Sequence, residues 1–203
     1  MNPSDTRAER GAEARVAALL DRLRLARLLA RWPARLVWAV YMFVNGFITI
    51  GVLALLAALT HNPFVFPSLG PTAYLFFFSP LAPASTPRNT IFGHAIALAC
   101  GYGAFALAGL SAQGGLPGHL MWPRVLAAAL SLSATGAVMV LADINHPPAG
   151  ATTLIVALGI IAEPRYLLVI EAAVILLTAQ AFVINRLAGL PYPLWRIRES
   201  PHD

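Results

Sequence analysis

The sequence predicts an all-α membrane protein, and three observations lead to this prediction. Hydrophobic residues make up 58% of the 203 residues and charged residues only 11%, which departs strongly from the composition of soluble domains. Four apolar stretches reach the roughly 20 residues that a helix needs to cross a bilayer. Two shorter apolar stretches begin with proline and glycine and lie in corresponding halves of the chain. The predicted architecture is two repeats of span, short helix and span, preceded by an amphipathic N-terminal helix.

The N-terminal segment, residues 1–35, is basic and amphipathic. All 14 basic residues of the chain are arginine, and eight of them precede the first long apolar stretch. Leucine and valine recur among these arginines at helical intervals, which predicts a helix that lies on the membrane surface. The positive-inside rule places this segment in the cytoplasm. Because no apolar core with a small-residue cleavage site follows the arginines, we expect the segment to remain on the protein.

The four long apolar stretches predict spans at about residues 36–59, 91–110, 122–141 and 166–184. The two shorter stretches cover residues 66–81 and 147–161. If the short helices cross the membrane, the chain has six spans and its halves are inverted; if they are re-entrant, it has four spans and the halves run parallel. We favour six spans, because about 16 residues of helix nearly cross the hydrocarbon core. Both schemes return the tail, residues 191–203, to the cytoplasm.

Matching motifs indicate that the domain, residues 36–190, contains two copies of one unit, at about 36–110 and 120–190. The proline-glycine-threonine motif recurs 80 residues later, in the pairs Pro67 and Pro147, Gly70 and Gly150, and Thr72 and Thr152. A Leu-Ala-Gly-Leu string recurs at the same displacement, at 107–110 and 187–190. A Pro-Arg pair recurs 77 residues later, at 87–88 and 164–165, which fits an insertion of three residues before this pair in the first copy.

The starts of the two short helices form the predicted binding site. Proline fits the first turn of a helix, and at mid-membrane depth the unpaired N–H groups of that turn must find a partner, such as an anion. Glycine lets a solute approach the backbone, and hydroxyl groups replace part of its hydration shell. The alternative is that glycine only permits close packing and the hydroxyls bond neighbouring carbonyls. The candidate substrate-binding residues are Ser68, Gly70, Thr72, His146, Pro147, Pro148, Gly150 and Thr152.

Two ionisable residues inside the apolar spans, His94 and Glu171, hold equivalent places in the two copies. An ionisable group within a span indicates a functional site by default, and both groups can carry a proton near neutral pH. They therefore predict proton coupling. The equally weighted alternative is that both lie at the interface, with Glu171 paired to Arg88 or Arg124. Just before the second short helix, Asn145 is expected to cap that helix.

The sequence lacks the patterns that would indicate several other classes of function. The single cysteine, Cys100, allows no intrachain disulfide, and the histidines lack metal-site spacing, so we expect neither a metal nor another cofactor. A P-loop and a nucleophile motif are missing, so we expect no ATP-driven pump, no catalytic residues and no enzyme. The basic charge is concentrated at one terminus, which argues against nucleic-acid binding. Two alternatives stay open: an intramembrane enzyme, and a sensor or assembly subunit whose basic helix binds a cytoplasmic partner.

The stretch Asn-His-Pro-Pro-Ala-Gly-Ala-Thr at 145–152 closely resembles the signature of the HPP family of integral membrane proteins. Upstream motifs of that family have similar counterparts in the same order: PSLGPTA at 67–73, PRN at 87–89, and Gly93-His94. The resemblance covers about residues 36–190. It implies the four spans usually described for the family, which keeps the re-entrant scheme open. It also adds Arg88 and Asn89 to the coupling or gating candidates.

Plastid and cyanobacterial members of the HPP family are implicated in nitrite uptake, and the resemblance therefore implies an anion substrate. We expect the chain to transport a small inorganic anion, nitrite first, either passively or with a proton. The expected location is the bacterial inner membrane, with both termini in the cytoplasm. The expected partners are the anion and the lipid bilayer, and homo-oligomer formation is left open.

Overall fold

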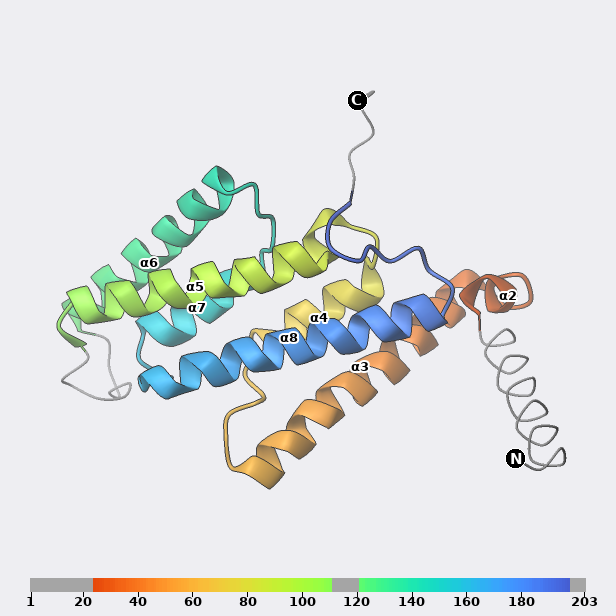
Figure 1. Cartoon of the computed structure of the whole chain (residues 1–203), viewed down its shortest axis with the longest axis horizontal. Helices are drawn as coiled ribbons and strands as arrows, with labels where there is room; N and C mark the ends of the chain where they lie inside the picture. Colours follow the sequence, from red (N-terminus) through yellow and green to blue (C-terminus); the bar gives the residue numbers. More distant parts are fainter. Residues whose placement is uncertain (1–23, 111–120, 198–203) are drawn as a thin grey trace, which may run out of the picture.

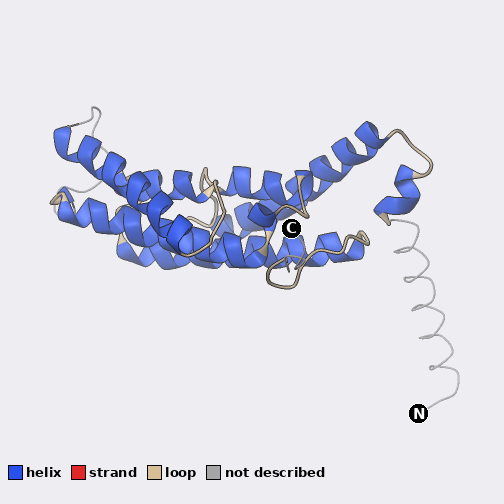
Figure 2. Ribbon diagram, turned by 90° about the horizontal axis from the view of Figure 1, so that it is seen from above, coloured by secondary structure: helices blue, strands red, loops and turns tan. Residues whose placement is uncertain are grey.

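The computed structural model describes residues 24–110 and 121–197, and every regular element in these residues is a helix (Figures 1 and 2). The described part holds seven α-helices and one short 3-10 helix. The surface helix predicted within residues 1–35 lies mostly outside the described residues. Its described end contains the short helix α2 (Leu25–Leu29), whose first residue is buried and donates its backbone N–H to the carbonyl of Ala188 over 2.9 Å.

Four helices are long and apolar enough to cross a membrane, which confirms the four predicted spans: α3 (Ala34–Thr60), α5 (Pro87–Leu107), α6 (Trp122–Leu141) and α8 (Pro164–Leu187). Helix α5 begins four residues earlier than predicted. The reason is local, because Pro87 occupies the first turn and the Thr86 hydroxyl caps the helix by accepting the backbone N–H of Asn89. The helix gives way to Gly109, whose φ of 69° suits glycine.

The two short apolar stretches form short helices, α4 (Leu69–Phe78) and α7 (Ala149–Ala157). Their first turns close in the same way. Gly70 donates its backbone N–H to Pro67, and Gly150 donates to Pro147, while Leu69 and Ala149 donate to the residues three positions earlier. The match extends to the turns after α5 and α8, where Gly109 and Gly189 both have positive φ. Residues that lie 80 positions apart in the chain therefore also share the same local backbone geometry.

The helices of the two halves run in opposite senses (Figure 1). Helices α3 and α5 run toward one end of the molecule, and α4 runs back between them. Helices α6 and α8 run the other way, and α7 runs against them. The helix α2 lies at the same end as the C-terminus of α8, because Leu25 bonds to Ala188. The start of α6 lies at the opposite end, where Arg124 donates to the carbonyl of Leu158 over 2.6 Å.

Helices α5 and α7 pack backbone to backbone because glycine provides the room. A Cβ atom at Gly101 of α5 would lie 2.8 Å from the carbonyl oxygen of Thr153 in α7. A Cβ atom at Gly93 would lie 2.7 Å from the Cβ of His146, in the segment before α7. Small residues allow this kind of close approach between membrane helices, where van der Waals packing drives association. The approach fixes His146 against α5.

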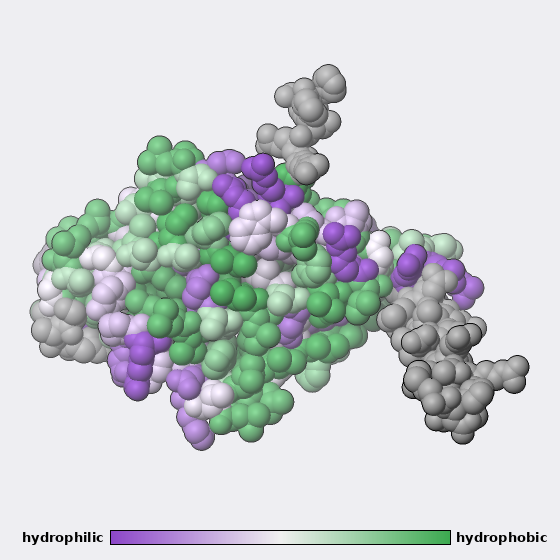
Figure 3. All heavy atoms as spheres, in the orientation of Figure 1, coloured by the Kyte–Doolittle hydropathy of each residue, from purple (hydrophilic) through white to green (hydrophobic). Residues whose placement is uncertain are grey.

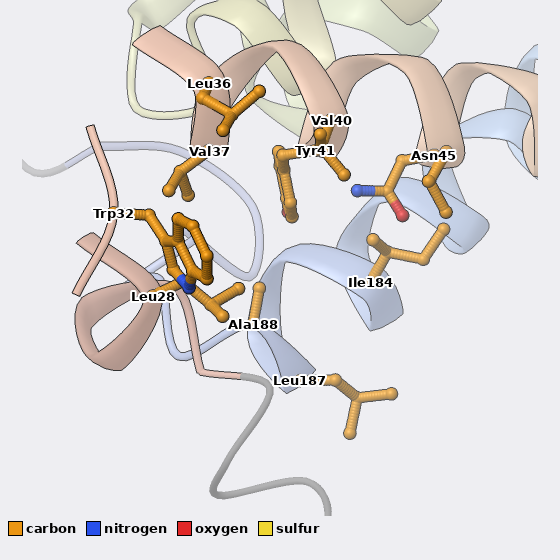
Figure 4. A pocket seen from close by; sticks show the side chains of 11 residues that line it. Leu28, Trp32, Leu36, Val37, Val40, Tyr41, Asn45, Ile184, Leu187 and Ala188 are labelled. Carbon is orange, nitrogen blue, oxygen red and sulfur yellow. The ribbon is translucent and has the colours of Figure 1, made fainter. Parts of the chain in front are cut away.

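The outer surface is largely apolar: on the face in Figure 3, hydrophobic residues predominate and hydrophilic residues form separate patches. On α3, the side chains of Phe43 and Phe47 are 74% and 73% exposed, respectively, which suits contact with lipid. A groove of about 600 Å³ opens between α2, α3 and α8 (Figure 4). Apolar side chains such as Trp32 and Ile184 line it, together with Tyr41 and Asn45. None of the predicted site residues lines this groove, so the candidate site lies elsewhere.

The tail after α8 folds back on the molecule. The Tyr192 side chain is fully buried, packs against Phe76 and Phe182, and donates its hydroxyl to the carbonyl of Ser85. Burial raises the pKa of the Tyr192 phenol, which keeps the hydroxyl protonated as a donor. Further along, the backbone N–H of Arg88 donates to the carbonyl of Trp195 over 3.0 Å. The tail therefore covers the short 3-10 helix η1 (Pro83–Ser85).

Candidate functional site: a buried histidine and hydroxyl cluster

Six polar side chains meet in the interior, and we call them the histidine–hydroxyl cluster. Each is at most 1% exposed: Ser68, Thr72, Thr90, His94, His146 and Thr152. They come from the start of α4, one face of α5, the segment before α7, and α7 itself. Because α4 and α7 both begin in the interior, their first turns bring polar groups to a depth that is otherwise apolar.

The cluster is a continuous path of hydrogen-bonding distances. The Ser68 Oγ lies 2.6 Å from the Thr152 Oγ1, which lies 2.7 Å from the His94 Nδ1. The His94 Nε2 lies 3.1 Å from the Thr72 Oγ1, which lies 3.3 Å from the His146 Nε2. The path ends where the His146 Nδ1 lies 2.7 Å from the carbonyl oxygen of Ala84 in η1. The hydroxyl of Thr90 lies beside this path, 3.4 Å from the His146 Nδ1.

The two imidazole rings face each other with centroids 5.0 Å apart and planes tilted by 57°. All the hydrogen-bonding partners described for either ring are hydroxyl or carbonyl oxygens; none is a carboxylate. Two charged imidazolium groups at this distance, both buried, would repel each other and lose their hydration. The closed cluster therefore suits neutral rings, each with one donor and one acceptor nitrogen.

The structure brings together Ser68, Thr72, His146, Thr152 and His94, but places other predicted residues elsewhere. Gly70 is exposed, and a Cβ atom there would meet no atom within 4 Å. A Cβ atom at Gly150 would approach Leu132 of α6 at 3.3 Å. Ser68 and Thr72 are one helical turn apart, so the residue between them points to the other side of α4. Pro147 is exposed and Pro148 is buried at the N-cap of α7.

Two expectations about the helix starts are wrong. The sequence predicts unpaired N–H groups in the first turns of the short helices, but tight turns pair those of Leu69, Gly70, Ala149 and Gly150. An anion would therefore meet hydroxyl and imidazole groups rather than a row of free backbone donors. The N-cap of α7 is Pro148, which lacks a side-chain donor or acceptor, and Asn145 is exposed instead of capping that helix.

The remaining coupling candidates lie outside the cluster. Glu171 lies on α8, and both its carboxylate oxygens are buried without a hydrogen-bond partner among the described residues. The alternative in which Glu171 pairs with Arg88 or Arg124 finds no hydrogen bond to either carboxylate oxygen among the described residues. Arg88 instead donates to the carbonyls of Asp143 and Ala142, over 2.7 and 3.1 Å. Arg88 thus caps the C-terminal end of α6, where a cation is favoured. Asn89 donates its side-chain amide to the carbonyl of Pro83 and so holds η1.

Sequence reasoning missed three positions that shape the cluster. Thr90 precedes His94 by one helical turn, and this spacing is a signal that could have been used. At Gly93 only a glycine leaves room for His146, which packs directly against it. The sequence shows the glycine but does not show which residue packs there. The carbonyl of Ala84 holds the His146 ring, but a backbone group leaves no signal in the sequence. Among the described residues, no group of three or more His, Cys, Asp or Glu could hold a metal ion.

One comparison with known proteins identifies the family. A family model described as "HPP, transmembrane region" matches residues 32–193. No curated protein and no solved structure matches the chain. The matched residues contain all four candidate spans, both short helices and the whole histidine–hydroxyl cluster. The chain therefore belongs to the HPP family and is an integral membrane protein of that family.

Proposed function

We propose that this protein moves a small inorganic anion, nitrite first, across the membrane through a site at the histidine–hydroxyl cluster. The observation that carries the proposal is the 2.6 Å contact between the hydroxyls of Ser68 and Thr152, deep inside a bundle of membrane helices. Burying so many polar groups costs stability unless they are paired, and a purely structural bundle has no need of them. Their position at the starts of two short helices is typical of transporter binding sites.

The chemistry of the cluster suits a small anion held by hydrogen bonds. Hydroxyl groups and the N–H groups of imidazoles can donate to nitrite oxygens and replace part of its hydration shell. The positive ends of the α4 and α7 dipoles point toward the same place and favour negative charge. The absence of a fixed cation among the described hydrogen-bond partners would keep binding weak enough for release.

The closed packing of the cluster implies a conformational step. Ser68 and Thr152 contact each other directly, so an anion that binds both must first separate the starts of α4 and α7. We propose that the anion inserts between these two hydroxyls and that the direct contact re-forms after release. Alternating exposure of one central site to the two sides is how transporters with inverted repeats work.

Six crossings with inverted repeats are the topology that we propose. The opposite senses of the helices in the two halves and the shared turn geometry of Gly70 and Gly150 support this topology. The distribution of arginine supports it too, because Arg88 lies at the end that carries both termini of the described chain and Arg124 at the other. With the arginine-rich end in the cytoplasm, the positive-inside rule is satisfied, and we propose the bacterial inner membrane as the location.

The test is uptake by liposomes that contain the purified protein, with nitrite, nitrate, formate, chloride and bicarbonate supplied in turn. We expect nitrite to enter faster than into empty liposomes and Thr152→Val to lower that rate at least tenfold. The matched control is Thr135→Val, because Thr135 forms a similar buried hydroxyl pair with Thr153, 2.9 Å apart and outside the cluster. Equal rates with and without protein for every anion would overturn the proposal, as would equal loss in both variants.

The alternative of a sensor or assembly subunit makes a different prediction for residues 1–23. Deletion of these residues would abolish partner binding in a sensor and leave uptake unchanged in a transporter. We propose that uptake by the shortened protein stays within twofold of the full chain. Loss of partner binding on deletion, combined with no uptake by either form, would favour the sensor.

A further inference from the structure

We propose that the histidine–hydroxyl cluster is a one-proton relay with a fixed direction, running from Ser68 through Thr152, His94 and Thr72 to His146. The proposal rests on the proposed function for its role in transport, since the relay would carry a proton from the anion site at Ser68 toward η1. The order of donors within the cluster follows from geometry alone. It assigns a specific tautomer to each of the two histidines.

The fixed point of the relay is the carbonyl of Ala84. A carbonyl oxygen can only accept, so the His146 Nδ1, 2.7 Å away, must carry the hydrogen. In a neutral ring the His146 Nε2 is then a bare acceptor. Its partner at 3.3 Å is the hydroxyl of Thr72, which must donate to it. One carbonyl thereby sets the direction of the Thr72 hydroxyl.

The same reasoning passes through Thr72 to His94. A hydroxyl has only one hydrogen, and Thr72 has given it to His146, so the His94 Nε2 at 3.1 Å must donate to the Thr72 oxygen. The His94 Nδ1 is then bare and accepts from Thr152 at 2.7 Å. Thr152 in turn accepts from Ser68 at 2.6 Å. The alternative, in which Thr72 donates to the carbonyl of Ser68 at 3.0 Å, leaves the buried His146 Nε2 without a donor, and an unsatisfied buried acceptor is unfavourable.

The relay conserves protons at every step. A proton delivered by water to the Ser68 hydroxyl displaces the Ser68 hydrogen to Thr152, and the Thr152 hydrogen moves to the His94 Nδ1. His94 then releases its Nε2 hydrogen to Thr72, which passes its own to the His146 Nε2, and the His146 Nδ1 hydrogen leaves to water near η1. One proton enters and one leaves. Afterwards each imidazole carries its hydrogen on the other nitrogen, and the His146 Nδ1 faces the Ala84 carbonyl with two lone pairs opposed. The chain returns to its original direction when both rings exchange that hydrogen with water and the hydroxyls rotate.

The charged groups around the rings do not interrupt this path. Arg88, on the same helix as His94, is turned to the carbonyls at the end of α6, and its nearest acidic partner is the exposed Asp143 at 4.0 Å. The groups that face the rings from α4, α5, α7 and η1 are hydroxyls or a carbonyl. Glu171 of α8 takes no part in any of these hydrogen bonds.

The first test reads the tautomers directly and does not depend on transport. We would record nitrogen-15 NMR spectra of histidine-labelled protein in lipid bilayers, with His61, His119 and His202 replaced by Gln. The expected spectra show hydrogen on Nδ1 of His146 and on Nε2 of His94. Thr72→Val should leave His146 unchanged and give His94 mixed tautomers, whereas Thr90→Val should change neither ring. The same tautomer on both rings, or a doubly protonated ring at neutral pH, would overturn the relay.

The second test measures coupling in liposomes. If one proton accompanies each nitrite, an inward gradient of one pH unit should sustain about tenfold accumulation after correction for empty liposomes. Thr72→Val should remove that accumulation while downhill exchange continues, and Thr72→Ser should restore it, which guards against a variant that merely misfolds. Gradient-driven accumulation that survives in Thr72→Val would overturn the relay alone. If the tautomers are as expected but the unaltered protein takes up no anion, the proposed function is overturned and the relay is not.

Discussion

The hydroxyl groups of Ser68 and Thr152 lie 2.6 Å apart in the interior, although 84 residues separate them along the chain. The contact joins the two halves of the chain asymmetrically, because the counterpart of Thr152 at a displacement of 80 residues is Thr72. Thr72 instead bonds to both imidazoles. Two similar halves thus meet in a cluster whose hydrogen bonds run in one direction. A strictly symmetric pair of motifs could not provide such a direction.

Gly93→Ala should destabilise the protein and slow uptake. The added Cβ would lie 2.7 Å from the Cβ of His146, so the ring must move away from Thr72 and Ala84. Overpacking of this kind costs about 1–3 kcal/mol. The matched control is Gly103→Ala on the same helix, where a Cβ meets no atom within 4 Å. Thermal unfolding in detergent and nitrite uptake would be compared, and equal behaviour of the two variants would contradict the packing described for His146.

Cysteine labelling should establish six crossings. In a Cys100→Ala background, Leu81→Cys should react with a membrane-impermeant reagent from the cytoplasmic side and Met121→Cys from the outside. Four spans with re-entrant helices predict the reverse for both positions. Two further positions serve as controls, because both schemes place Arg196→Cys inside and Glu163→Cys outside. All four side chains are on exposed residues, so access to the reagent depends on topology.

Tyr192→Phe should loosen the tail without disturbing the helices. The variant keeps the ring that packs against Phe76 and Phe182 but leaves the carbonyl of Ser85 without the phenol hydrogen. Leaving that group unpaired costs about 1–3 kcal/mol, seen as a lower unfolding temperature. Tyr74→Phe, at a half-exposed ring with no hydrogen bond described for its hydroxyl, is the control. If Tyr192→Phe has the same unfolding temperature as the unaltered protein, the hydrogen bond of the tail contributes little to stability.

The Tyr192 phenol also predicts a dependence on alkaline pH. Burial raises its folded-state pKa above the ordinary value of about 10, so its contribution to stability is complete below that value and is lost as the pH rises further. The unfolding temperature of the unaltered protein should therefore fall more steeply above about pH 10 than that of Tyr192→Phe. Parallel curves for the two proteins would show that the phenol does not limit stability there.

Glu171→Gln should leave proton-driven accumulation intact. The sequence makes Glu171 and His94 equivalent, but the structure gives only His94 a place in the cluster. Gradient-driven uptake by Glu171→Gln should match that of the unaltered protein, while His94→Gln should lose it. If Glu171→Gln behaves like His94→Gln, the carboxylate is a second coupling group and the relay does not act alone.

Hydropathy predicts the long helices well, because spanning a bilayer imposes length and composition on each of them. α6 has the predicted bounds, and α5 shifts by a few residues because its cap, Thr86, was not used in placing its start. The paired motifs predicted both short helices and four of the six cluster residues. The same motifs also included Gly70, which the structure places outside the cluster. Spacing along the chain shows that residues share a helix, but it does not show which face of the helix each residue occupies. Ala84 and Gly93 matter through a backbone oxygen and an empty space, and neither leaves a chemical signature in the sequence.

The return of Tyr192 to Ser85 has a consequence for biosynthesis. A chain emerges from the ribosome at about 5–20 residues per second, and early segments of most proteins begin to fold before later ones are made. Here η1, which holds His146 through Ala84, is secured by a residue synthesised more than a hundred positions later. We therefore expect the first half to enter the membrane early and the turn at Ala84 to reach its final form only after α8 is inserted and the tail is released. A ribosome that stalls in the last codons would therefore leave an inserted protein with an unfinished interior, a state that membrane proteases could distinguish from the completed one.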